Sequence, residues 1–153
     1  MWRDDAGDIP MTTSSSKRHA LQEHVRWSDV DASSIIRWSA YTRFVELAET
    51  ELFREIGFPY ATLWDQLDIW LPRVQFHLDC RNPARLDELL DVEIWVSRIG
   101  RSSIRFEFAM KKPDGQLVAE GFLVIVSINR TDGKPVEVPG PLTGALAPYV
   151  VAP

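Results

Sequence analysis

The spacing of apolar residues changes midway along the chain, and this change restricts the fold more than any other feature. Between Trp38 and Ile56, apolar residues recur every three or four positions, and after Leu71 they alternate with polar residues. The first spacing places side chains along one face of a helix, and the second places them on one face of a strand. One long helix followed by several half-polar strands predicts an α+β fold in which the helix covers an antiparallel sheet.

The predicted helix is the most sharply bounded element. Gly57 and Pro59 end it, because glycine closes helices and proline does not continue them. A short helical turn is expected within residues 60–70, a PDG turn at 113–115, and no regular structure beyond a turn or two after residue 138. The apolar stripe of the helix comprises Tyr41, Phe44, Val45, Ala48, Leu52 and Ile56.

The strands follow from alternation. The first is expected between His19 and Trp27, where Leu21, either His24 or Val25, and Trp27 are the candidates for inward side chains. One helix leaves apolar sheet surface and a sheet edge uncovered, which predicts a homo-oligomer. The later alternating runs are Val74, Phe76, Leu78 and Cys80; Val92, Ile94 and Val96; and Ile104, Phe106 and Phe108. Residues 116–129 are expected to form a long, mostly apolar strand.

Composition limits the class of protein. The 153 residues suit one domain, with a disordered tail at 1–18, a folded region at 19–139 and a C-terminal extension at 140–153. A net charge of −5 gives no general attraction to nucleic acid, and no apolar run approaches the roughly 18 residues of a membrane span. The one cysteine, Cys80, and three scattered histidines predict neither a disulfide framework nor a metal site, as expected of a cytoplasmic protein. Met11 is an alternative start to Met1.

Two acids stand directly ahead of the predicted helix. Asp29 and Asp31 lie in the polar sequence SDVDASS, and most aspartates in such a place serve turns or helix starts. A carboxylate beside a helix N-terminus also suits acyl-transfer chemistry, because unpaired N–H groups and the helix dipole stabilise an oxyanion. The residues alone leave both interpretations open.

Three segments together resemble a known family. They are 29-DVDASSIIRWSAY-41, 83-PARLDELLDVEI-94, and 100-GRSSIRFEF-108 followed by residues 115–139. In order and spacing they are similar to the hot-dog-fold acyl-CoA thioesterases of the 4-hydroxybenzoyl-CoA thioesterase group. The resemblance covers roughly residues 20–138. It implies an antiparallel sheet wrapped around one long central helix, a homodimer or homotetramer, and active sites at the subunit interface.

The resemblance also implies roles for individual residues. Asp31 would be the catalytic carboxylate, acting as a nucleophile or as a general base, and the backbone N–H of Trp38 would polarise the thioester carbonyl. Arg101, Ser102 and Ser103 would line the CoA site. Further cations for that site would be Arg98 and Arg130.

The helix start departs from the pattern of many relatives, D-x-D-x-x-G-V-V-Y-H-x-N-Y. Ser34, Trp38 and Ala40 replace its glycine, histidine and asparagine. Loss of the histidine disfavours the short-aliphatic branch, and Trp38 favours an aromatic or bulky acyl group. Asp29 is expected to be structural, and the helical acids are expected to form a solvated face, although Glu46 and Glu49 are alternative catalytic acids.

The resulting hypothesis is an acyl-CoA thioesterase that needs no metal or organic cofactor. Two alternatives stay open, namely a non-catalytic acyl-CoA binding module and a hot-dog enoyl-thioester hydratase. The hydratase would require a partnered histidine and carboxylate, which the sequence pattern does not indicate. A serine nucleophile is disfavoured for the same reason.

Overall fold

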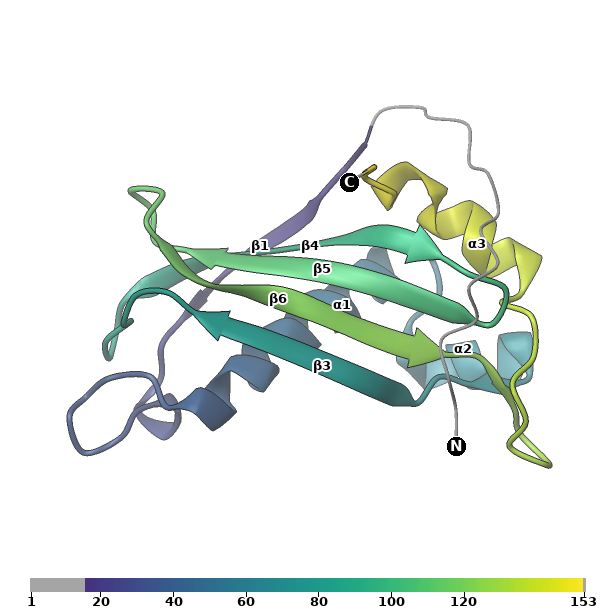
Figure 1. Ribbon diagram of the computed structural model, residues 1–153, viewed down its shortest axis with the longest axis horizontal. Helices are drawn as coiled ribbons and strands as arrows, with labels where there is room; N and C mark the ends of the chain where they lie inside the picture. The colour runs from purple at the N-terminus through teal and green to yellow at the C-terminus, as the bar shows by residue number, and fades with distance from the viewer. Residues whose placement is uncertain (1–15, 153) are drawn as a thin grey trace.

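A computed structural model describes residues 16–152 of the chain and shows one five-stranded antiparallel sheet (Figure 1). Most of the predicted tail, and Met11, lie outside the described residues. The strand order across the sheet is β1-β4-β5-β6-β3, and β2 and β7 form a separate pair. The strands are β1 (His19–His24), β2 (Ile69–Trp70), β3 (Arg73–Cys80), β4 (Leu89–Ile99), β5 (Ser103–Lys111), β6 (Leu117–Val126) and β7 (Ile128–Asn129).

The long helix covers one face of this sheet. A single 3₁₀ turn at Trp38–Ala40 leads into α1 (Tyr41–Glu55), which crosses the sheet behind it in Figure 1. Gly57 follows with a φ of 87°, the left-handed conformation that commonly ends helices. The predicted fold class, an antiparallel sheet with one long helix packed against it, is confirmed.

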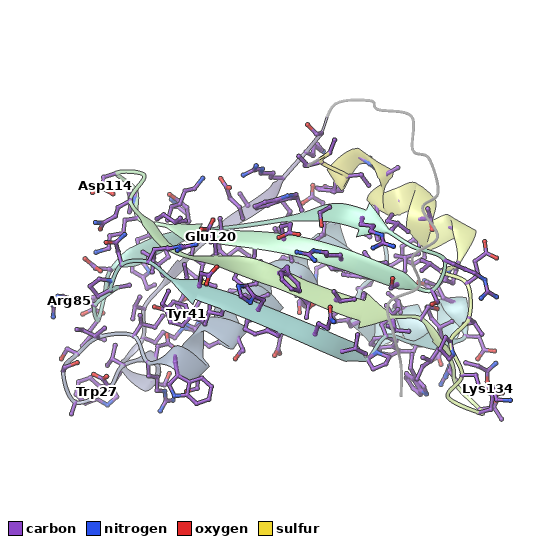
Figure 2. The ribbon with its side chains drawn as sticks, viewed as in Figure 1. Trp27, Tyr41, Arg85, Asp114, Glu120 and Lys134 are labelled. Carbon is purple, nitrogen blue, oxygen red and sulfur yellow. The ribbon has the colours of Figure 1, made fainter. Side chains whose placement is uncertain are left out.

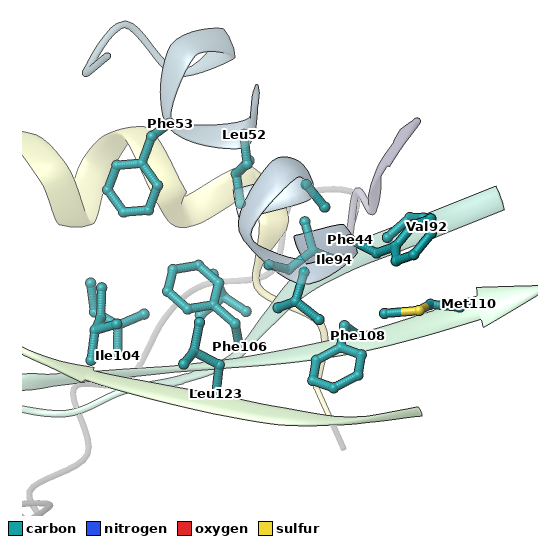
Figure 3. Packing of buried hydrophobic residues seen from close by; sticks show 14 of the residues in the cluster. Phe44, Leu52, Phe53, Val92, Ile94, Ile104, Phe106, Phe108, Met110 and Leu123 are labelled. Atoms are coloured by element: carbon teal, nitrogen blue, oxygen red, sulfur yellow. The ribbon is translucent and has the colours of Figure 1, made fainter. Parts of the chain in front are cut away.

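The core lies between α1 and the inner face of the sheet (Figure 3). Phe44, Leu52 and Phe53 from the helix meet Ile94 and Phe106 from the central strands, and all five are essentially inaccessible to water. Fully burying one such side chain stabilises the fold by about 1.5–3 kcal/mol. The inward side chains that the alternation predicts in β4 and β5 therefore pack against α1 and hold it on the sheet.

The sheet edge formed by β3 explains one wrong prediction. In the described structure β3 pairs with β6 on one side only, so its inward side chains are incompletely covered. Phe76 is 42% exposed, and Cys80, which the alternation places on the same inward face and so predicts to be buried, is exposed. Period-two spacing assigns a side chain to a face, but it does not say whether another strand covers that face.

Two further predictions need correction. Trp27 does not point inward, because the chain leaves β1 at His24 and enters a 3₁₀ turn (Trp27–Asp29) that leaves the indole 79% exposed. The C-terminal segment was predicted to have at most a turn or two of regular structure; it has the two helical turns of α3 (Gly140–Leu146), which bury two leucines, and a further 3₁₀ turn (Ala147–Tyr149). Proline at the second position of α3 is compatible with a helix start.

The short connection after α1 is also more regular than predicted. Helix α2 (Tyr60–Leu67) has one fully buried residue, Leu63. Lys17 and Arg18, assigned to the disordered tail, make contacts: the Lys17 N–H donates to the Pro148 carbonyl, and Arg18 lies over the Trp95 ring. Within residues 16–152, no helix is both long enough and apolar enough to cross a membrane.

Candidate active site

A small hairpin carries the candidate catalytic acid. In the Asp31 hairpin (residues 29–37), the Asp31 N–H donates to the Ile35 carbonyl at 3.0 Å and the Arg37 N–H donates to the Asp29 carbonyl at 2.9 Å. Ser34 closes its tip with a φ of 60°, where relatives with the quoted pattern have a glycine. The Cβ atom of serine makes this left-handed conformation less favourable than it is for glycine.

The hairpin is fixed against the loop that joins β3 to β4. The Ile36 N–H donates to the Ala84 carbonyl at 2.8 Å, and Ile35 bridges to Arg85. Figure 2 shows Trp27 and Arg85 together at one end of the sheet, with Lys134 at the other. The Asp31 hairpin therefore belongs to the end of the sheet where β4 begins.

Asp31 itself is exposed at this end. Its Oδ1 atom accepts hydrogen bonds from the Ser33 N–H at 2.8 Å and the Ser33 hydroxyl at 2.5 Å. The Ile35 N–H also contributes to stabilising the carboxylate. The two bonds from Ser33 lower the pKa of Asp31 below its usual value of 3.8, so the carboxyl is ionised at neutral pH.

Asp29, by contrast, is 2% exposed and bound on all sides. Its carboxylate accepts both prongs of the Arg43 guanidinium, with Nε at 2.8 Å, and the Arg26 N–H at 2.8 Å. Burial would raise the pKa of Asp29, but the bonds from Arg43 and Arg26 outweigh burial and hold the pKa below its usual value. The structural role predicted for Asp29 agrees with these contacts.

Trp38 begins the turn that leads into α1. Its indole is 80% exposed, and its backbone N–H donates no backbone hydrogen bond within the described part of the chain. Ile35 lies opposite Asp31 in the hairpin, and Trp38 comes three residues after Ile35. At strand spacing, Trp38 is therefore roughly 10 Å from Ile35 along the chain. A side chain and a bound carbonyl group together span such a gap.

A cleft of about 190 Å³ lies between α1 and the sheet. It starts at Thr42 in the first turn of the helix and is walled by the edge strand β3. Apolar side chains and charged side chains both line it. The residues around it are Thr42, Val45, Glu46, Glu49, Arg73, Phe76 and Leu123.

Glu49 contradicts the prediction of a solvated acidic face. Its side chain is 1% exposed and accepts hydrogen bonds from the Tyr60 hydroxyl and from Arg73 Nη2, the latter at 2.5 Å. Burial raises the pKa of Glu49 above its usual value of 4.5, although Arg73 and Tyr60 act in the opposite direction. Sequence could not show this, because the two partners lie 11 and 24 residues away.

The proposed CoA residues lie at the opposite end of β4. Arg101 is exposed in the turn after β4, whereas Ser102 and Ser103 are buried, and the Ser102 carbonyl accepts the Ser127 N–H at 2.7 Å. The eleven residues of β4 span roughly 35 Å at strand spacing. The described chain therefore brings Asp31 near Trp38, but it does not bring either near Arg101.

Two histidines have carboxylate partners that the sequence did not indicate. His19 Nδ1 lies 2.6 Å from Glu55, at the far end of α1, and His77 Nε2 lies 3.1 Å from Asp79. His77 and Asp79 line a groove of about 320 Å³ on the face of the sheet away from α1. Among the described residues, no group of three or more His, Cys, Asp or Glu could hold a metal ion.

Comparison with known proteins identifies the family. A model of the thioesterase-like superfamily matches residues 25–146, most of the chain. The acyl-CoA thioesterase YbgC of Haemophilus influenzae is 27% identical over 115 residues, which cover 75% of this chain and 84% of that protein.

Solved structures show the same fold. A 1,4-dihydroxy-2-naphthoyl-CoA thioesterase from Synechocystis aligns with a TM-score of 0.79 at 17% identity, covering 85% of this chain and 96% of that one. A Staphylococcus aureus protein solved in complex with CoA aligns with a TM-score of 0.81 at 13% identity, covering 90% and 87%. The fold is the hot-dog fold, and the class is that of the thioester hydrolases.

The chain belongs to the thioesterase-like superfamily. At the level of this family, the comparisons support acyl-CoA thioester hydrolysis as the activity.

Proposed function

We propose that the protein hydrolyses acyl-CoA thioesters to a free acid and CoA, with Asp31 as the catalytic carboxylate and the start of α1 as the oxyanion site. One observation carries the assignment: an exposed, ionised carboxylate is held by Ser33 on a hairpin that leads directly into the helix start. Neither interaction requires a metal or an organic cofactor.

Asp31 suits either of two routes. Its Oδ2 atom can attack the thioester carbonyl carbon, expelling CoA thiolate and leaving an anhydride that water then cleaves. Alternatively it takes a proton from a water molecule that attacks the same carbon. Both routes need the ionised carboxylate, which the Ser33 bonds favour.

The start of α1 would stabilise the charge that develops on the carbonyl oxygen. The Trp38 N–H is available, and the N-terminal end of a 15-residue helix carries a positive partial charge. The exposed Trp38 side chain is not needed for this, so it is free to form a wall of the substrate site.

We infer that the cleft beside α1 takes the acyl group. Its 190 Å³ is less than the roughly 300 Å³ at which pockets for drug-sized ligands begin, which favours a single ring or a short chain. Phe76 lies on its wall and stacks on Phe108 with ring centroids 5.6 Å apart, so an aromatic surface faces the cleft. These features support a preference for an aromatic or compact bulky acyl group.

The binding site for the CoA moiety would lie on the surface of a second copy of the chain. The Arg101 guanidinium can bind a phosphate. The buried Ser102 follows it in the turn, and the buried Ser103 begins β5. Because Arg101 lies a full strand length from Asp31, a shared site would require a homodimer or homotetramer. The outer edge of β3 pairs with no further strand among residues 16–152, so a second copy could extend the sheet there.

A thiol-release assay over a panel of acyl-CoAs tests the proposal. The panel would contain acetyl-, decanoyl-, benzoyl-, 4-hydroxybenzoyl- and phenylacetyl-CoA. CoA thiol is expected to be released fastest from the aryl thioesters. Tight binding without release from any member would favour the acyl-CoA binding module. An enoyl-CoA would be tested beside the panel, and loss of its absorbance without thiol release would favour the hydratase.

A further inference from the structure

The first turn of α1 is tied to the base of the Asp31 hairpin by an arginine that also reaches the end of β1. Arg43 donates from Nε and Nη2 to the two oxygens of Asp29, and from Nη2 to the His24 carbonyl at 3.3 Å. Its Nη1 lies 3.7 Å from Glu23. One guanidinium therefore connects the helix start, the end of β1 and the base of the hairpin.

This connection is buried where it matters. The Asp29 side chain is 3% exposed and that of Arg43 is 30% exposed, so the pair is only partly screened by water. Two-pronged arginine–carboxylate pairs fix relative orientation as well as distance. Removing one partner of such a pair would leave the other charge buried without compensation, so the two groups are expected to stay together. We call this pair the joint.

The joint controls the relative position of the two proposed catalytic groups. Asp31 lies two residues beyond Asp29, and Trp38 follows Arg37, whose N–H donates to the Asp29 carbonyl at 2.9 Å. The Asp29 carbonyl thus bonds the second strand of the hairpin, at Arg37, while the Asp29 carboxylate bonds α1, at Arg43. A shift of the joint would move Asp31 relative to the Trp38 N–H.

We propose that Asp29 and Arg43 are positioning residues, which set the turnover rate by fixing the Asp31 carboxylate relative to the start of α1 without touching the substrate. This inference rests on the proposed function. Misplacing a catalytic group by about 1 Å can cost roughly a hundredfold in rate, so a flexible joint should affect turnover more than binding.

The test compares Asp29→Asn and Arg43→Lys with the control Glu51→Gln, which removes an exposed ion pair to Arg54 on the same helix. The substrate is the acyl-CoA that the wild type releases fastest. Asp29→Asn is expected to lower kcat at least about tenfold with KM changed less than about threefold, since the lost interaction acts on the reacting geometry. The control should leave both values unchanged.

Arg43→Lys provides a second variant in case Asp29→Asn does not fold. Lysine keeps the positive charge but offers a single ammonium group, so kcat should fall in the same direction by a smaller factor. An unchanged kcat in a folded variant, or a rise in KM alone, would overturn the inference.

Amide hydrogen exchange provides a readout that does not depend on activity. The amides of residues 31–37 should exchange faster in Asp29→Asn, whereas those of residues 48–56 should not change. Unchanged exchange at 31–37 would refute the positioning role. If the wild type hydrolysed no substrate, the proposed function would fail, and the exchange result would still decide whether the pair holds the hairpin.

Discussion

Glu49 is a buried carboxylate in the lining of the proposed acyl cleft, and replacing it with glutamine tests the electrostatics of that site. Glutamine keeps the shape and an acceptor for the Tyr60 hydroxyl, but it removes the charge. Arg73 is 42% exposed and also lies near Glu46, so water and a second acid compensate for the lost partner. We therefore expect Glu49→Gln to change the free energy of unfolding by less than about 1.5 kcal/mol at pH 7.

Truncation to alanine should be more damaging. It leaves the buried Tyr60 hydroxyl without its acceptor, at about 1–3 kcal/mol, and removes a buried methylene worth about 0.8 kcal/mol. The sum is about 2–4 kcal/mol. For a chain of this size that corresponds to a loss in Tm of roughly 5–15 °C.

The dependence on pH gives the sharper test. Because burial raises the pKa of Glu49 in the folded state, the folded protein holds this proton more tightly than the unfolded chain does. The stability from this group is therefore full below about pH 4.5 and is lost as pH rises through the folded pKa. Wild type should lose stability relative to Glu49→Gln as pH increases from 4 to 8.

Urea unfolding of both proteins at several pH values measures this difference. A wild type that instead gains stability over Glu49→Gln with rising pH would show that the ion pair with Arg73 outweighs burial, and the reasoning would be refuted.

Three other substitutions and one measurement of oligomeric state have definite expected outcomes. Gly121→Ala would place a methyl group 1.9 Å from the His77 carbonyl oxygen, so it should destabilise the protein by about 2 kcal/mol or more, measured by thermal unfolding; an unchanged Tm would contradict this packing. Tyr149→Phe removes the 2.5 Å bond to Glu55 that fastens the C-terminal turn to α1, and should cost about 1 kcal/mol in urea unfolding, whereas no loss would mean that the bond is not formed in solution. Trp38→Ala removes the indole and keeps the proposed oxyanion N–H, whereas Trp38→Pro removes both, and Arg37 already has the extended conformation that precedes proline. Trp38→Pro should therefore have a kcat roughly a hundredfold below that of Trp38→Ala; equal rates of the two variants would exclude this donor. Light scattering at micromolar concentration should show a dimer or tetramer, and a monomer would rule out the shared site.

The central helix and sheet could be predicted because their signals are local. The stripe from Tyr41 to Leu52 reports a single buried face, and every residue of the predicted stripe up to Leu52 is buried. Alternation in β4 and β5 likewise gave the correct inward side chains. In each case, neighbours within a few positions decide which face of the element is buried.

The missed features depend on partners distant in sequence. Glu49 is buried because Tyr60 and Arg73 satisfy it, and Cys80 is exposed because β3 is an edge of the described sheet. No local pattern encodes either fact.

The candidate site divides in the same way. The position of Asp31 ahead of the helix follows from the motif, but the bond between Asp29 and Arg43 joins residues 14 positions apart. The separation of Arg101 from Asp31 likewise emerges only from the length and direction of β4.

The measurement that tests the account most directly is kcat/KM of Asp31→Asn on the best acyl-CoA substrate. Asp114→Asn is the matched control, because Asp114 also accepts a hydrogen bond from the N–H two residues on, in the exposed turn between β5 and β6. Asparagine keeps the acceptor oxygen but can neither attack the carbonyl nor take a proton. We predict a fall of at least about a hundredfold for Asp31→Asn and none for the control. Equal activity of Asp31→Asn and wild type would contradict the assignment of Asp31 as the catalytic carboxylate.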